Sequence, residues 1–146
     1  MIIDKETLAE LFAQAEASPR KRMNLDMRTS AEDGSQRMLN ALLPGTEVAI
    51  HRHPMSSETV ICLSGRMDEV IYKEASPKSS PKGKDLGIHT AFEEAERIHL
   101  CPAEGKYGCQ IPQGVWHTVE VFEPSVIFES KDKAYGQDGS EIKAGT

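Results

Sequence analysis

The chain has 146 residues, with 17 Lys and Arg against 23 Asp and Glu, and a formal net charge of −6. This length suits one domain with its own core, and this acidic balance argues against nonspecific nucleic-acid binding, which depends on Lys and Arg. The sequence has neither an apolar run of membrane-spanning length nor the N-terminal pattern of a signal peptide, so we expect no membrane contact. Its 3 cysteines show no CxxC spacing and do not make a disulfide framework, which favours a reduced, cytoplasmic protein.

The N-terminal residues predict a helix. Asp4 is a suitable N-cap, and Pro19 marks the end. The apolar residues between them follow the i, i+3, i+4, i+7 spacing of one helix face: Leu8, Leu11, Phe12 and Ala15. We therefore expect residues 1–18 to form a helix that packs on the rest of the domain. Residues 89–96 are the one other candidate for a short helix.

From residue 19 to residue 136 the sequence consists of short β-prone runs separated by turn residues. The runs are 22–27, 36–43, 47–51, 59–63, 67–73, 97–100, 107–111, 118–122 and 126–130. The turn pairs include Pro44-Gly45, Ser64-Gly65 and Glu123-Pro124. Many short strands with regular turn signals are typical of an all-β sandwich or barrel, so we expect one such domain over 19–136. Residues 75–87, rich in Pro, Ser and Lys, predict an exposed loop, and residues 137–146 predict a flexible tail.

The most informative segment runs from Gly45 to Gly65. His51 and His53 are two positions apart, so on a strand their imidazoles point to the same side. Glu58 follows after a predicted turn, and His117 begins a later β-prone run. An isolated His-x-His pair is weak evidence, because most such pairs lie on the surface or make hydrogen bonds. Three imidazoles and one carboxylate together suit a divalent transition metal, whereas calcium prefers oxygen ligands.

This segment matches the first conserved motif of the cupin superfamily, G-x5-H-x-H-x4-E-x6-G, at every fixed position. Residues 112–117 resemble the second motif, from which the chain departs in the placement of Gly105 and in having Val121 in place of Asn. More narrowly, the chain resembles the WbuC family of cupin-fold metalloproteins, which are often associated with bacterial surface-polysaccharide gene clusters. The features that carry this resemblance lie at residues 22–25, 36–41, 51–54, 116–118 and 128–131.

The resemblance implies a cupin jelly-roll, or double-stranded β-helix, with one divalent metal (Zn, Fe, Mn or Ni) inside the barrel near one mouth. His51, His53, Glu58 and His117 would be the ligands, with one or two positions left open. A closed structural zinc site is the alternative, although Glu is an uncommon ligand in such sites.

Six further residues are candidates for the site. Glu129 and Lys131 alternate with their neighbours on the last predicted strand, so both side chains can point inward, and an inward Glu129 would be a candidate general base. A surface ion pair is the alternative for these two residues. Cys62 shares strand parity with Glu58, although a small buried hydrophobe is the more common role of a free Cys.

Arg37 and Asn40 lie on opposite faces of a regular strand, so at most one of them faces the pocket. An inward Arg37 would bind a carboxylate or phosphate group, and surface exposure is the alternative. Tyr107 and Trp116 flank His117 in sequence and would line the substrate pocket or pack in the core.

Three functions fit these residues. The first is a metal-dependent isomerase or epimerase acting on a small polar metabolite, plausibly a carbohydrate, by Lewis-acid chemistry. The second is an iron-dependent dioxygenase, and the third is a non-catalytic metal-binding or ligand-binding module. The expected partner is a small-molecule ligand. We also expect a homodimer, because pairing would cover exposed strand edges.

Overall fold

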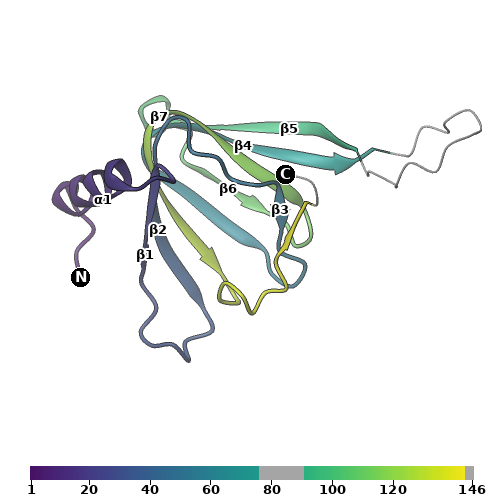
Figure 1. Ribbon diagram of the computed structural model, residues 1–146, viewed down its shortest axis with the longest axis horizontal. Coiled ribbons are helices and arrows are strands. Elements are labelled where there is room, and N and C mark those ends of the chain that lie inside the picture. The colour runs from purple at the N-terminus through teal and green to yellow at the C-terminus, as the bar shows by residue number, and fades with distance from the viewer. Residues whose placement is uncertain (76–90, 144–146) are drawn as a thin grey trace, which may run out of the picture.

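The computed structural model describes residues 1–75 and 91–143. It contains one α-helix, α1 (Lys5–Ala17), and a short 3-10 helix, η1 (Pro102–Glu104). The strands are β1 (Arg22–Asp26), β2 (Gln36–Leu42), β3 (His51–Arg52), β4 (Glu58–Glu74), β5 (Phe92–Leu100), β6 (Gly108–Ile111), β7 (Trp116–Lys131) and β8 (Glu141–Ile142). They form one curled antiparallel sheet (Figure 1), which confirms the predicted all-β jelly-roll with an N-terminal helix. Within the described ranges, no helix has the length and apolar character needed to cross a membrane.

The long strands β4 and β7 organise the sheet. The C-terminal half of β7 lies between β2 and the first half of β4, and its N-terminal half pairs with the second half of β4 and with β3. β5 and β6 both pair with β4. Because directly opposed residues point to the same side, these registers determine which side chains face the inside of the curl.

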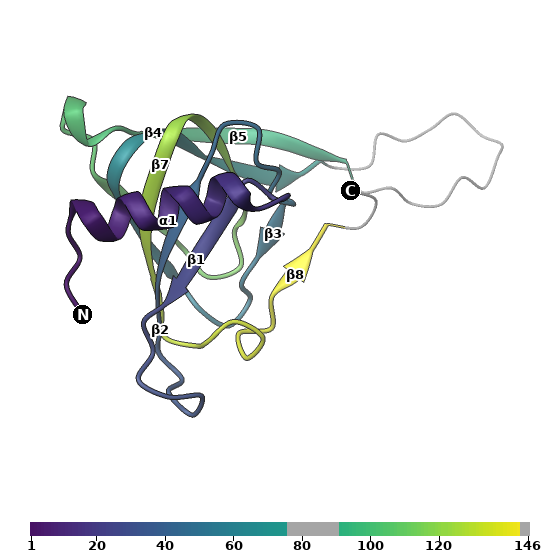
Figure 2. The same ribbon diagram turned by 60° about the vertical axis from the view of Figure 1, so that its left-hand side comes forward.

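The two faces of the sheet bury separate apolar clusters. The inner cluster contains Leu42, Val60, Cys62, Met67, Leu100, Val121 and Ile127. On the outer face, Leu11 and Ala15 of α1 pack against Leu39, Ala41 and Val126. Figure 2 shows α1 lying across β1 and β2. The Asp4 side chain accepts a hydrogen bond from the Thr7 amide, so the predicted N-cap and apolar stripe are both confirmed.

In two places the structure joins two predicted strands into one. The predicted runs 59–63 and 67–73 both belong to β4, and the predicted runs 118–122 and 126–130 both belong to β7. Gly65 and Pro124 lie inside β4 and β7, where the register of this strand pair shifts between Cys62 and Met67. The turn prediction at these positions was therefore wrong, because Gly65, with a φ of 103°, is part of an irregular stretch of paired strand. Residues 92–96, expected as part of a helix, belong to β5, since pairing with β4 overrides their helix propensity. Of the predicted 47–51 strand, His51 is in β3, and the predicted loop at 75–87 lies outside the described residues except for its first residue.

Residues 137–143 pack against the rest of the domain. Glu141 and Ile142 form β8, which pairs with β3, and the Asp138 side chain is fully buried. The expectation of a flexible tail from residue 137 was therefore wrong for residues 137–143, since this polar segment packs through hydrogen bonds and charge pairs. Residues 144–146 lie outside the described residues.

Candidate metal centre

Four side chains converge at one end of the curled sheet. One ligand atom from each of His51, His53, Glu58 and His117 lies within 4.8 Å of all the others. The strand register explains this convergence: His51 of β3 is the direct cross-strand partner of His117 of β7, and their ring centroids are 4.3 Å apart. A turn at residues 54–55 then brings Glu58, the first residue of β4, beside them.

Backbone carbonyls orient two of the three histidines. His51 Nδ1 lies 2.8 Å from the Ala49 carbonyl oxygen, and His117 Nδ1 lies 2.9 Å from the Val115 carbonyl oxygen. A carbonyl only accepts hydrogen bonds, so each ring donates through Nδ1–H and is left with an unprotonated Nε2 when neutral. That is the tautomer a metal ligand requires.

The third histidine is held by side chains. His53 Nδ1 lies 2.9 Å from Asp138 Oδ2 and 2.8 Å from Ser140 Oγ. Asp138 also accepts a hydrogen bond of 2.5 Å from Lys131 Nζ. Lys131 therefore faces the inside, as expected from strand parity, but it is already bound to a carboxylate beside a candidate ligand. A carboxylate behind a metal-binding imidazole orients the ring and increases its basicity.

Burial and the neighbouring charges shift the pKa values of three residues in the cluster. Burial, and then the neighbouring His117, lowers the pKa of His51 to about 4, so this imidazole is neutral at neutral pH. Burial alone would raise the pKa of Glu58, but the adjacent imidazoles of His117 and His53 bring it below its usual value. Glu58 is therefore ionised and the His51 imidazole neutral, which are the states that bind metal. Burial alone would lower the pKa of His117, but the adjacent Glu58 carboxylate raises it above its ordinary value, so a metal ion that binds here displaces a proton from this ring.

Two buried atoms of the cluster lack a well-formed hydrogen bond. Glu58 Oε2 lies 3.0 Å from His53 Nε2 and 3.3 Å from His117 Nε2, yet neither Glu58 Oε2 nor His117 Nε2 has a hydrogen-bond partner. Unpartnered polar atoms are costly in a protein interior, and a cation between them would satisfy both. The nitrogen and oxygen donor set fits a divalent transition metal.

Of the other predicted site residues, Glu129 and Cys62 face the inside of the sheet. Glu129 is the cross-strand partner of Val60, and Cys62 is the partner of Ile127. Burial, and then the charge of Glu58, raises the pKa of Glu129 to about 8. Cys62 packs in the inner apolar cluster, and burial raises its pKa to about 11, so it has the role of a small buried hydrophobe.

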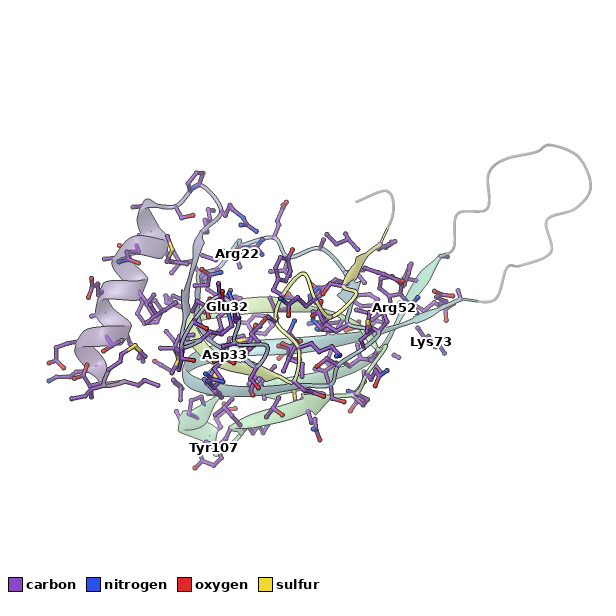
Figure 3. All side chains as sticks on the ribbon, turned by 90° about the horizontal axis from the view of Figure 1, so that it is seen from below. Arg22, Glu32, Asp33, Arg52, Lys73 and Tyr107 are labelled. Carbon is purple, nitrogen blue, oxygen red and sulfur yellow. The ribbon has the colours of Figure 1, made fainter. Side chains whose placement is uncertain are left out.

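The structure does not bring Arg37, Tyr107 or Trp116 into the centre. Arg37 forms a 2.6 Å ion pair with Asp33. It points to the outer face of the sheet, as does Leu39 two residues further along β2. Tyr107 is 62% exposed, on the side of the sheet away from Arg52 in Figure 3. The Arg52 guanidinium covers the Trp116 ring, with its central carbon 4.6 Å from the ring centroid. The predictions that these three side chains line the pocket were therefore wrong. Strand parity directs Arg37 and Trp116 to the outer face, and Tyr107 lies just before β6, outside the paired strands.

Sequence reasoning missed two buried acids. Glu69 of β4 is fully buried, and its Oε2 atom has no hydrogen-bond partner. Asp138 had been assigned to a flexible tail. No sequence signal distinguishes either residue from surface acids, because both are placed by long-range strand pairing.

The curled antiparallel sheet has the cupin fold, and its four converging side chains could hold a metal ion. A family model described as a domain of unknown function (DUF6016) matches residues 3–80, and the chain belongs to this family. No curated protein matches its sequence significantly.

Solved structures show the same fold at low sequence identity. TT1209 from Thermus thermophilus is 22% identical, with a TM-score of 0.54, over 90% of this chain and 96% of that one. An oxalate oxidase in complex with glycolate is 14% identical, with a TM-score of 0.54, over 86% of this chain and 57% of the oxidase. The capsular polysaccharide assembling protein CapF from Staphylococcus aureus is 15% identical, with a TM-score of 0.58, over 86% of this chain and 32% of CapF. The chain therefore spans about half of the oxidase and a third of CapF.

Proposed function

We propose that this chain is a divalent-metal-binding cupin that acts on a small polar metabolite by isomerisation or epimerisation. The observation that carries the proposal is the convergence of four ligand atoms within 4.8 Å, with Glu58 Oε2 and His117 Nε2 buried and unpartnered. A divalent ion held by these ligands would supply Lewis-acid polarisation of a substrate carbonyl or hydroxyl oxygen.

Glu129 is the residue we assign to proton transfer. It lies on the inner face, and its pKa of about 8 suits a group that both takes up and releases a proton near neutral pH. In an isomerisation, Glu129 would remove a proton from the hydroxyl-bearing carbon beside the substrate carbonyl and return it to the former carbonyl carbon, while the hydroxyl proton passes to the former carbonyl oxygen. In an epimerisation, the proton would return to the opposite face of the same carbon, which needs a second acid.

Carbohydrates are the first substrates to test. The chain resembles WbuC proteins, which are associated with surface-polysaccharide gene clusters, and it shares its fold with a capsular polysaccharide assembling protein. The choice of carbohydrates rests on these two similarities of family and fold. The chemistry of the site requires only a polar ligand with an oxygen atom that can bind the metal. The proposal also includes a homodimer in the cytoplasm, and light scattering during size-exclusion chromatography tests the dimer.

A non-catalytic metal-binding module is the second candidate, and one observation favours it. His53, Glu58 and His117 are only 6%, 4% and 2% exposed, which limits the approach of a substrate. An iron-dependent dioxygenase would use the same ligands with ferrous iron.

Elemental analysis by mass spectrometry of protein purified without an affinity tag or added metal is the first experiment. About one equivalent of Zn, Mn or Ni would support the Lewis-acid function, and aldoses and ketoses would then be incubated in D2O. Exchange of the hydrogen beside the carbonyl, seen by proton NMR with the wild type and lost with Glu129→Gln, is the expected result. Stoichiometric Fe together with oxygen consumption would instead support the dioxygenase. Metal without exchange for any sugar would support the non-catalytic module.

A further inference from the structure

Three consecutive basic residues, Arg20, Lys21 and Arg22, follow α1, and none of them forms an ion pair with a residue that the structure describes. The chain has seven arginines, all of them in the described ranges. Arg20 and Arg22 are the two without a carboxylate partner there, although acidic residues outnumber basic ones by 23 to 17. The arginines that pair with Asp or Glu are Arg28, Arg37, Arg52, Arg66 and Arg97. Adjacent unpaired cations in an acidic chain favour an anionic ligand at this position.

Arg20 and Lys21 line a surface hollow of about 290 Å³, between the turn that follows α1 and the segment that leads to β3. Pro19, Gly45 and Glu47 complete its walls. None of the four candidate metal ligands lines this hollow, so it is separate from the metal centre. Small-molecule sites have volumes from about 300 Å³ upward, and the hollow is therefore large enough for a compact ligand only.

The backbone of Lys21 has an unusual conformation for its residue type. Its φ is 55°, the one positive φ among the non-glycine residues of the described chain. Gly and Asn adopt this left-handed conformation at a lower cost than Lys does. The Lys21 side chain lies over Gly45, since Lys21 Nζ is 3.1 Å from the position that a Cβ atom on Gly45 would occupy. A costly residue at this turn favours a role for its ammonium group in the hollow.

Hydrogen bonds connect the two walls of the hollow. Arg22, the first residue of β1 (Figure 3), donates a hydrogen bond of 3.3 Å from Nη1 to the Glu47 carbonyl oxygen. The Thr46 hydroxyl donates a hydrogen bond of 2.7 Å to the Arg20 carbonyl oxygen. The turn after α1 and the segment before β3 are therefore held together without a ligand, which lowers the entropic cost of binding one.

The charges around the hollow indicate the kind of anion. Arg and Lys bind phosphate oxygens through charge-assisted hydrogen bonds, and the planar Arg group can bind two oxygens at once. Glu47 is exposed and adds one carboxylate to the same hollow. A polyanion such as a nucleic acid would be repelled by this carboxylate and by the net charge of −6. A small molecule with a single phosphate group avoids most of this repulsion, and a hydroxyl group of the same molecule can donate a hydrogen bond to Glu47.

We propose that Arg20, Lys21 and Arg22 form a binding site for the phosphate group of a small molecule. The site requires no metal ion, so it goes beyond the proposed function and is tested independently of it.

Inorganic phosphate is the probe, titrated into the 15N-labelled full-length protein at constant ionic strength. Amide chemical shifts measured by NMR are expected to change saturably in residues 19–22 and 43–47. Because phosphate also binds metal ions, the titration is repeated with His53→Ala, which lacks a candidate metal ligand. The same shifts are expected there. Shifts confined to the surroundings of the four candidate ligands, or absent altogether, would overturn the phosphate site and leave the metal centre untouched.

Substitutions test the charges. Arg20→Gln and Lys21→Asn should each weaken phosphate binding about tenfold or more, because each removes a charged hydrogen-bond donor. Glu47→Gln should strengthen it, since it removes the one carboxylate of the hollow. Lys106→Asn is the matched control for Lys21→Asn, because Lys106 is an exposed lysine that does not line the hollow. Equal affinities for the wild type, Arg20→Gln and Lys21→Asn would overturn the proposal.

Two further measurements separate binding from folding and from other ligands. Lys21→Asn should unfold at a temperature no lower than that of the wild type, because Asn adopts a positive φ more readily, so its loss of affinity would not reflect a loss of structure. A single-stranded oligonucleotide should bind no more tightly than phosphate at physiological salt. Tighter binding of the oligonucleotide that is lost in Arg20→Gln would overturn the small-molecule ligand in favour of a nucleic acid.

Discussion

Asp138 Oδ2 lies 2.9 Å from His53 Nδ1 and so connects the C-terminal segment to the candidate metal ligands. The same carboxylate accepts a hydrogen bond from the buried Lys131. β8, which follows Asp138, pairs with β3, the strand that carries His51. Residues 137–143 therefore orient His53 and pair with the strand that carries His51.

Replacing Asp138 by Asn should weaken metal binding without removing it. The amide keeps the size of the side chain but loses the charge that orients His53, and the loss of such a partner typically costs about 10–100-fold in metal affinity. Competition with a chromophoric zinc chelator measures the change. Glu141→Gln is the control, because it removes a carboxylate of the same segment whose ion pair is with Arg52. Equal affinities for the two variants would contradict an orienting role of Asp138.

The four candidate ligands could be predicted from the sequence because their spacing has a local geometric meaning. His51 and His53 point to the same face because side chains alternate along a strand. The residues between His53 and Glu58 predict the turn that brings Glu58 beside the two histidines. His117 was supported by a motif, and it lies directly across from His51 in the paired strands.

Residues that depend on long-range pairing could not be predicted in the same way. Glu69 and Asp138 look like surface acids in the sequence, yet both are fully buried. Ser64-Gly65 has the composition of a turn, and only its contact with Ser125 in the paired strand shows that it belongs to an irregular stretch of β4. The sequence allows two orientations for Arg37, and the packing of α1 on Leu39 assigns this side of β2 to the outer face.

His51→Ala and His53→Ala should each abolish stoichiometric metal binding, because either change removes one of four converging ligand atoms. Glu58→Ala should weaken binding less, since three imidazoles remain. Metal content after dialysis, determined by mass spectrometry, gives the result. His99→Ala is a suitable control, as His99 is bound to Asp68 outside the cluster. Full metal content in both the His51 and His53 variants would rule out the proposed centre.

Gly65→Ala should destabilise the protein by about 2–4 kcal/mol, as expected for strain combined with overpacking. Gly65 has a φ of 103°, and a Cβ atom there would lie 2.3 Å from Ser125 Oγ and 2.4 Å from the Pro124 carbonyl oxygen. Urea unfolding measures the change in free energy. Gly34→Ala provides the comparison, because a Cβ atom at Gly34 meets nothing within 4 Å, and its effect should be below about 1 kcal/mol. Similar losses in the two variants would show that Gly65 is not constrained.

The contribution of Glu129 to the stability of the metal-free protein should fall as the pH rises from about 5 to about 8. Burial and the charge of Glu58 raise the pKa of Glu129 from 4.5 to about 8, so in this range the folded state binds more protons than the unfolded state. This contribution then decreases with pH until Glu129 is ionised in both states. Glu129→Gln removes this contribution, so stability relative to the wild type should increase as the pH rises through this range, whereas the exposed Glu123→Gln should leave the dependence unchanged. The midpoints of urea unfolding between pH 5 and pH 9 measure both slopes, and an identical slope for the wild type and Glu129→Gln would show that Glu129 is not held protonated inside the sheet.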